Sequence, residues 1–197
     1  LINNKEMILH VYDAAKKSRS GEVYVATPDQ KIIDKVESYG GNAILTDQNH
    51  QTGTDRVFEI FKKTLNQAPK IIINLQGDMP NIKPESIKQL AEYMRYEKCD
   101  IATLASTLLT DEAYDQNVVK VYTKEKIKNL SFVAASDFDR KITTGHNNLA
   151  YHHIGIYGFT KEALIKYVNL KRSKLELERG LEQMRAFENN MKIHVGF

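Results

Sequence analysis

The sequence holds a single cysteine, Cys99, among its 197 residues. One cysteine excludes an internal disulfide, and a lone thiol cannot build a thiolate cage around a metal ion. We therefore expect a reducing, cytoplasmic setting. Apolar runs are also short, and none approaches the ~20 residues that a membrane-spanning helix needs. These shortages argue against a disulfide-stapled domain and against a helical membrane protein.

Blocks of one charge are missing as well. The net charge of +3 comes from interspersed residues, and the densest basic group, Lys171-Arg172 with Lys174, is more typical of a solvated helix approach than of a phosphate track. We therefore expect neither nucleic acid nor a membrane as a partner. Residues 1–6 have no initiator methionine and no secretion-signal pattern, so we expect the natural N-terminus to lie upstream.

The composition is that of an ordinary globular domain. Hydrophobic residues make up 42% and charged residues 27% of the chain, a balance that supplies a buried core. The length lies within the range of one domain, and no repeat, low-complexity stretch or Pro/Gly linker divides it. We expect residues 1–197 to form a single domain.

The first half alternates apolar strands with amphipathic helices. We expect strands at residues 22–26, 42–45 and 71–75. Thr27 is placed to cap a helix with Pro28 at its first position, and further helices are expected over 54–65 and from Pro84 onward. This alternation predicts a three-layer α/β fold with a mostly parallel central sheet.

The second half predicts a smaller, strand-rich lobe. We expect strands at residues 118–122, 127–132, 153–159 and 192–197. We expect a polar loop at 137–148 and helices at 161–168 and 176–189. Ser173 with Glu176 three residues later is a capping box for the second helix.

Three segments carry candidate chemistry, and the first follows the buried strand 71–75. In open α/β sheets ligands bind at the carboxyl ends of strands, which favours a site at Gln76, Gly77 and Asp78. A carboxylate there can hold Mg²⁺ together with substrate phosphate oxygens and water. Gly77 permits close approach of a phosphate or ribose. The alternative is a tight turn, for which Gly-Asp is common.

The second segment reads His-Gln-Thr-Gly-Thr-Asp-Arg at residues 50–56, directly before an amphipathic helix. Backbone N–H groups and a helix N-terminus suit a phosphate or the polar edge of a base. Arg56 lies in the first turn, where the helix dipole disfavours a cation that lacks an anionic partner. The alternative is an exposed loop capped by Thr52 or Thr54.

The third segment pairs a strand with a later helix. His153, Gly155 and Tyr157 share one strand face, so an imidazole and a phenol flank a glycine gap that can admit a ligand. Glu182 and Gln183 supply acceptors and donors for sugar hydroxyls. Taken by itself, His153 is more typical of a half-buried histidine with a satisfied hydrogen bond.

In their order along the chain these motifs resemble the 3-deoxy-manno-octulosonate cytidylyltransferases, the enzymes that activate the eight-carbon sugar acid Kdo. The resemblance spans essentially the whole chain, and it also takes in these segments: Ile2-Asn3-x-Lys5-x-Met7-Ile8-x-His10-Val11, Val25-Ala26-Thr27, Asn74-x-Gln76-Gly77-Asp78-x-Pro80, Ala102-Thr103-Leu104, Val119-Lys120-Val121, His153-x-Gly155-Ile156-Tyr157-Gly158 and Leu181-Glu182-Gln183-x-Arg185.

The resemblance implies a reaction in which CTP and Kdo give CMP-Kdo and pyrophosphate with Mg²⁺, in the cytoplasm, in a homodimer, for lipopolysaccharide synthesis. By matching position Asp78 is the catalytic metal ligand. The implied nucleotide-binding residues are His50, Gln51, Thr52, Gly53, Thr54, Arg56, Gln76 and Gly77. The implied sugar-acid residues are His153, Tyr157, Glu182 and Gln183. Lys120 either steadies a phosphate or carboxylate or is solvated at a strand edge.

Departures from the family keep two alternatives open. The family's triphosphate-gripping loop is expected before Leu1 and its second metal-binding aspartate after Phe197, so this chain alone is expected to be inactive. Met79 stands where the family has Glu, and Phe132 where it has Arg. The alternatives are a non-catalytic homologue and a cytidylyltransferase for another acid sugar such as a sialic acid.

Overall fold

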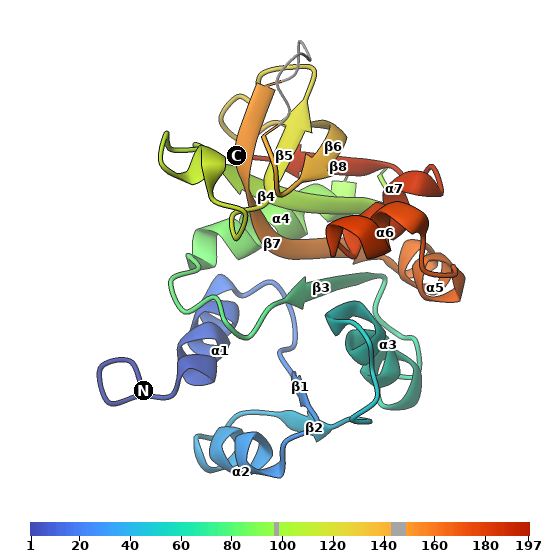
Figure 1. The fold of residues 1–197 in the computed structure, drawn as a ribbon. Coiled ribbons are helices and arrows are strands. Elements are labelled where there is room, and N and C mark those ends of the chain that lie inside the picture. Colours follow the sequence, from blue (N-terminus) through green and yellow to red (C-terminus); the bar gives the residue numbers. More distant parts are fainter. Residues whose placement is uncertain (97–98, 143–148) are drawn as a thin grey trace.

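The computed structural model describes residues 1–96, 99–142 and 149–197, which form helices and strands in mixed order (Figure 1). The helices are α1 (Met7–Ser18), α2 (Gln30–Ser38), α3 (Gly53–Lys63), α4 (Pro84–Tyr96), α5 (Lys161–Asn169), α6 (Lys174–Arg179) and α7 (Gln183–Glu188), with a 3-10 turn at Glu112–Tyr114. The strands are β1 (Val25–Thr27), β2 (Ala43–Leu45), β3 (Ile71–Leu75), β4 (Ile101–Ser106), β5 (Lys120–Thr123), β6 (Phe132–Asp139), β7 (Leu149–Thr160) and β8 (Ile193–Gly196).

The strands form two sheets. β1 and β2 pair in parallel, and a six-stranded sheet has the order β3-β7-β4-β8-β6-β5. β5 also pairs with β7, so the strand-rich part of the large sheet closes on itself. This closed part is the strand-rich lobe expected for the second half of the chain, and it lies at the top of Figure 1.

The expectation of a mostly parallel central sheet is wrong. In the large sheet β4 and β8 pair in parallel, whereas every other pairing among the described strands is antiparallel. The reason is β7, the long strand that returns from the closed lobe and runs antiparallel between β3 and β4. The helical crossover through α4 does leave β3 and β4 running in the same direction, because both are antiparallel to β7, but they are not neighbours.

Helices cover both faces of the large sheet, and β4 shows how the two cores are divided. Ile101 and Ala105 face one core, which includes side chains of α3, α5 and α7. Ala102 and Leu104 face the opposite core, which includes side chains of α1 and α4. Because successive strand residues point to opposite faces, a strand buried on both sides has no polar stripe. The three-layer expectation is thereby confirmed.

Local expectations differ from the structure where capping groups compete. The cap of α2 is Asp29, whose carboxylate accepts from the Lys31 N–H, so Thr27 belongs to β1 and Pro28 precedes the helix. The single helix expected over 176–189 is two helices, because Gly180 takes a left-handed conformation with φ of 62°. The Ser173–Glu176 capping box is present at the start of α6.

Both ends of one predicted strand were also misplaced. The strand expected at 127–132 is β6, which begins at Phe132 and runs through part of the predicted loop to Asp139. The rest of that loop, 143–148, lies outside the described residues. Helix α1 was not expected at all. It packs against α4. The pattern did not indicate it, because no strand precedes these residues in the sequence to suggest an α/β unit.

A cleft of about 980 Å³ separates the small sheet from the large one. Apolar side chains of α1, α3, β1 and β3 line it, among them Ile8, Val25, Val57, Ile71 and Ile73. None of the described helices is both long enough and apolar enough to cross a membrane.

Candidate functional site

The N-terminus of α3 lies against the end of β3, which brings two of the candidate segments together. Thr52 caps the helix: its hydroxyl oxygen accepts from the Asp55 N–H at 3.2 Å. Gly53 lies so close to Gln76 that an added Cβ would sit 3.2 Å from its Nε2 atom. A side chain here would therefore press on Gln76, which gives the glycine a packing reason of its own.

A hydrogen-bonded chain continues from Gln76 to the C-terminal helices. The Gln76 amide donates to Asn74 Oδ1 at 3.4 Å, Asn74 Nδ2 donates to the Thr54 hydroxyl at 3.1 Å, and that hydroxyl donates to Glu182 Oε2 at 2.9 Å. Burial raises the pKa of the Glu182 carboxyl, although hydrogen bonds from Thr54 oppose the shift. Residues assigned to the nucleotide and to the sugar acid thus contact each other directly.

Next to this series of hydrogen bonds lies a second buried cluster, on β7. The Tyr157 hydroxyl donates to Gln183 Oε1 at 3.1 Å, and burial raises the pKa of this phenol well above its usual range. The His153 and Tyr157 rings lie 5.5 Å apart, which confirms that they share a face. A bulge between them puts Gly155 out of regular register, with open space where a Cβ would be.

One atom of this cluster lacks a protein partner. Gln183 Nε2 is a buried amide donor without a hydrogen-bonding acceptor in the described part of the chain, and its side chain is only 5% exposed. An unpaired buried donor costs free energy on the order of 1–3 kcal/mol. Such an atom beside Tyr157 and Glu182 marks a place where a ligand oxygen would complete the hydrogen bonding.

His153 is buried, with 7% of its surface exposed, and not half-buried as expected. Its Nε2 lies 2.9 Å from the Thr103 hydroxyl, which is also 2.7 Å from the Ile156 carbonyl. Since the hydroxyl has one proton to donate to the carbonyl, it accepts from the imidazole, and Nδ1 is left as an acceptor. Burial lowers the pKa of His153 to about 3, so the ring is neutral near pH 7.

His50 and Arg56 of the 50–56 loop bond to α3 and to the segment that precedes the loop. His50 contacts the Glu59 carboxylate, and this hydrogen bond lowers the pKa of Glu59 to about 2. Arg56 donates to the Thr46 hydroxyl and to the Asp47 carbonyl at 2.8 Å, so its partners are neutral oxygens rather than an anionic side chain. Both contacts hold the loop in shape.

Asp78 is exposed in the turn two residues beyond Gln76, as is Gly77, where an added Cβ would lie 3.1 Å from Ile8 of α1. No group of three or more His, Cys, Asp or Glu side chains suited to a metal occurs among the residues that the structure describes. Mg²⁺ commonly takes one or two protein carboxylates and completes its shell with water and substrate phosphate oxygens. A single exposed carboxylate at the carboxyl end of β3 fits that role.

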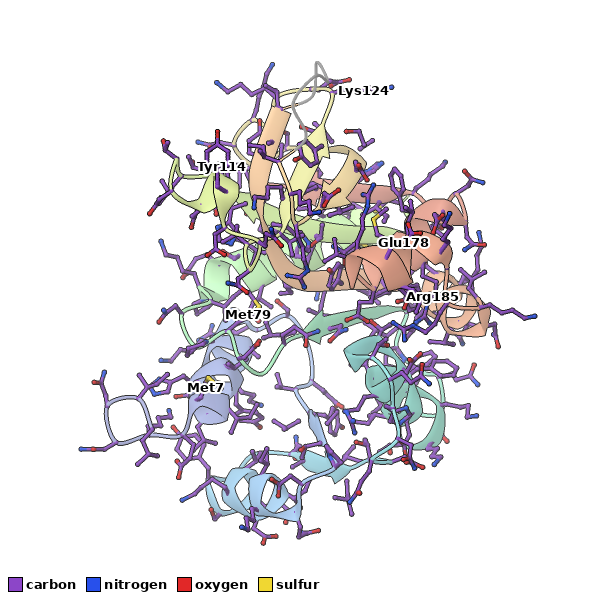
Figure 2. All side chains as sticks on the ribbon, viewed as in Figure 1. Met7, Met79, Tyr114, Lys124, Glu178 and Arg185 are labelled. Carbon is purple, nitrogen blue, oxygen red and sulfur yellow. The ribbon has the colours of Figure 1, made fainter. Side chains whose placement is uncertain are left out.

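The structure explains two of the positions left open by the sequence, Phe132 and Lys120, and locates a third, Met79. Phe132 stacks on Tyr93 with ring centroids 3.8 Å apart and covers Gly196, so it fills space rather than facing an anion. Met79 lies in the loop between β3 and α4 (Figure 2). Both expectations for Lys120 are wrong: the side chain is fully buried, and its ammonium donates to the carbonyls of Asp115, Val118 and Arg140.

No role was assigned from the sequence to a charged cluster formed by Arg172, Glu176 and Arg185. Arg185 is buried and donates two hydrogen bonds to Glu176, at 2.8 and 2.7 Å, and Glu176 also accepts from Arg172. Burial alone would raise the pKa of Glu176, but these arginines outweigh it and lower the pKa. The Glu-Gln-x-Arg motif contained the signal for Arg185; only the fold reveals its partners.

Comparisons with known proteins agree with this arrangement. The sequence profile of the cytidylyltransferase family matches residues 1–193. A 3-deoxy-manno-octulosonate cytidylyltransferase of Thermodesulfovibrio yellowstonii is 44% identical over 206 aligned residues, covering 99% of this chain and 81% of that protein. The enzyme of the same name from Bartonella bacilliformis is 36% identical over 196 residues, covering 98% of this chain and 80% of its own length.

A solved structure is similar as well. It is described as CMP:2-keto-3-deoxy-manno-octonic acid synthetase complexed with CTP, and it superposes with a TM-score of 0.83 at 33% identity. The match covers 97% of this chain and 78% of that one. On the profile match, the relatives and the shared fold together, the chain belongs to the cytidylyltransferases, in the 3-deoxy-manno-octulosonate cytidylyltransferase family.

Proposed function

We propose that this protein transfers a cytidylyl group from CTP to Kdo. An oxygen of the sugar acid's anomeric hydroxyl bonds to the α-phosphorus, the bond from that phosphorus to the β-phosphate oxygen breaks, and pyrophosphate leaves with its electron pair. The hydroxyl proton passes to solvent. The observation that carries the proposal is Gln183 Nε2, a buried donor without an acceptor among the described residues, beside a series of hydrogen bonds that leads to the α3 N-terminus.

On the nucleotide side, the supporting features are the first turn of α3 and Gln76. The helix N-terminus offers the positive end of the helix dipole, which favours phosphate oxygens; the Asp55 and Arg56 N–H groups are already bonded to Thr52. The amide of Gln76 lies at the mouth of the same site. We assign His50, Gln51, Thr52, Gly53, Thr54, Arg56, Gln76 and Gly77 to the nucleotide.

On the sugar side, neutral donors and acceptors predominate. Gln183 supplies an amide proton, and Tyr157 holds that amide in place through its hydroxyl. The neutral imidazole of His153 contributes an acceptor at Nδ1, and Glu182 can accept from a sugar hydroxyl. Such a set distinguishes a polyhydroxylated acid by hydrogen-bond geometry and not by charge alone.

Asp78 is assigned as the residue that holds Mg²⁺. When bound, the ion neutralises triphosphate charge, which displacement at phosphorus requires. The chain's own part is to orient the two substrates, since alignment supplies a large share of the rate in such reactions. We further propose a homodimer that acts in the cytoplasm, where CTP is made; light scattering on purified protein tests the dimer.

The test is pyrophosphate release with CTP and Mg²⁺, offered either Kdo or a sialic acid. Release with Kdo and not with sialic acid is expected, and Asp78→Asn should abolish it. Gln183→Leu should raise KM for Kdo while leaving KM for CTP unchanged, because the amide belongs to the sugar side. The proposal fails if the folded full-length protein releases no pyrophosphate with either sugar; that outcome favours a non-catalytic homologue.

A further inference from the structure

The charged cluster under the site touches both of its halves. Arg185 is 3% exposed and lies between the C-terminal helices and α3 (Figure 2). Its guanidinium binds Glu176 of α6 with two hydrogen bonds, lies 4.6 Å over the ring of Tyr167 of α5, and approaches Asp55 of α3 at 3.7 Å. One buried cation therefore joins the C-terminal helices α5 and α6 to α3, which lies far earlier in the sequence.

Each of these contacts leads to a residue of the proposed site. Asp55 accepts from the Thr52 hydroxyl at 2.8 Å, so its position fixes the cap of α3. The Tyr167 hydroxyl donates to the Glu182 carbonyl at 3.0 Å, which fixes the start of α7. Arg172, which shares Glu176 with Arg185, reaches Gln51 at 3.4 Å.

The charges of this cluster favour an ion pair between Arg185 and Glu176 that persists at every working pH. The hydrogen bonds from Glu176 raise the pKa of Arg185 further above its usual range, so this residue stays cationic at all working pH values. Two arginines face two carboxylates, which leaves no net buried charge. The planar guanidinium presents separate N–H groups to Glu176 and Asp55, a geometry that an ammonium cannot reproduce.

We propose that Arg185 is a positioning residue that sets the nucleotide loop, residues 50–55, against the sugar-binding helix α7. It does not touch substrate; it holds Thr52 through Asp55 and Glu182 through Tyr167. The kinetic part of this inference, the change in KM, rests on the proposed function. Its structural part, the position of the loop, does not depend on turnover.

The test compares Arg185→Lys and Asp55→Asn with Arg179→Met as the matched control. Arg179 is also an ion-paired arginine of this region, but its partners Asp137 and Asp139 lie on β6, away from the loop. Asp55→Asn removes the negative charge that faces Arg185 on α3 and keeps the Arg185–Glu176 pair, so it guards against a variant that merely fails to fold. The readouts are amide hydrogen exchange by mass spectrometry and steady-state kinetics, both on the full-length protein.

We expect both test variants to speed exchange in residues 50–56 while β4 to β7 keep wild-type rates. KM for CTP should rise about tenfold with kcat retained within a factor of about three, as for the loss of a coupling between neighbouring elements. Arg179→Met should change neither. Unchanged exchange in the loop, or a rise spread evenly over the whole chain with KM unaltered, would overturn the proposal. If no variant or wild-type protein turns over, the proposed function fails and the loop exchange alone decides this inference.

Discussion

The neutrality of His153 leads to a sharp prediction about acid. Burial lowers its pKa to about 3 in the folded protein, against an ordinary value of 6.5. The unfolded chain therefore binds a proton here between those two values while the folded protein does not. Stability from this residue is complete above pH 6.5 and is lost as the pH falls towards 3.

The size of the effect follows from the two values. In the pH range in which only the unfolded state titrates, each unit of pH changes the free energy of unfolding by about 1.36 kcal/mol. Between pH 7 and pH 5, protonation of the unfolded imidazole therefore lowers the free energy of unfolding by about 2 kcal/mol. The perturbation is His153→Gln, which keeps a polar side chain but cannot titrate. The variant should lose about 2 kcal/mol less than wild type on going from pH 7 to pH 5.

Urea unfolding at both pH values measures this difference. Because the sequence has no tryptophan, far-UV circular dichroism is the suitable signal. Thr103→Val is the control: it removes the hydrogen-bond partner of the ring and lowers stability at both pH values, but it leaves the buried imidazole and its pH dependence. If His153→Gln and wild type lose the same stability on acidification, burial does not hold the imidazole neutral and the reasoning is wrong.

Three further predictions concern packing and polar burial. Gly196→Ala should destabilise by about 1–3 kcal/mol, because its Cβ would lie 2.5 Å from the Phe132 ring, and Phe132→Leu should recover part of the loss; thermal unfolding of the single and double variants tests this. Thr54→Val should cost about 1–3 kcal/mol and raise KM for substrate, since Asn74 and Glu182 lose their shared partner; equal stability to wild type would contradict the chain of hydrogen bonds. Lys120→Met should expose the segment near Asp115 to limited proteolysis, because three carbonyls lose one donor; an unchanged cleavage pattern would refute that role.

Sequence patterns predicted those elements whose signals are local. The apolar run at Ile71–Leu75 is a strand, and the capping box at Ser173 starts a helix. Where two local signals compete, the pattern gave the wrong answer. Asp29 caps α2 in place of Thr27, since a carboxylate next to the helix can accept from its first free N–H. Gly180 interrupts a periodic helix, because glycine adopts a left-handed conformation at little steric cost.

Strand order was not predictable because it depends on contacts far apart in the sequence. Strand β4 was not among the predicted strands, and nothing local indicates that β7 lies between β3 and β4. The same holds for the site. Motifs named Thr54 and Glu182 separately, 128 positions apart, and only the fold puts their oxygens 2.9 Å from each other. The burial of Lys120 was likewise hidden, since lysines are mostly exposed.

The cleft between the two sheets has a consequence for handling the protein. Among the described strands β1 pairs with β2 alone and β3 with β7 alone, so each has one edge facing the apolar cleft. A strand edge beside apolar side chains is a template for pairing with another extended chain. Concentrated solutions of these 197 residues are therefore expected to self-associate through added strands, and a charged substitution at a half-buried position of β1 that lines the cleft, such as Ala26→Lys, should keep them dispersed.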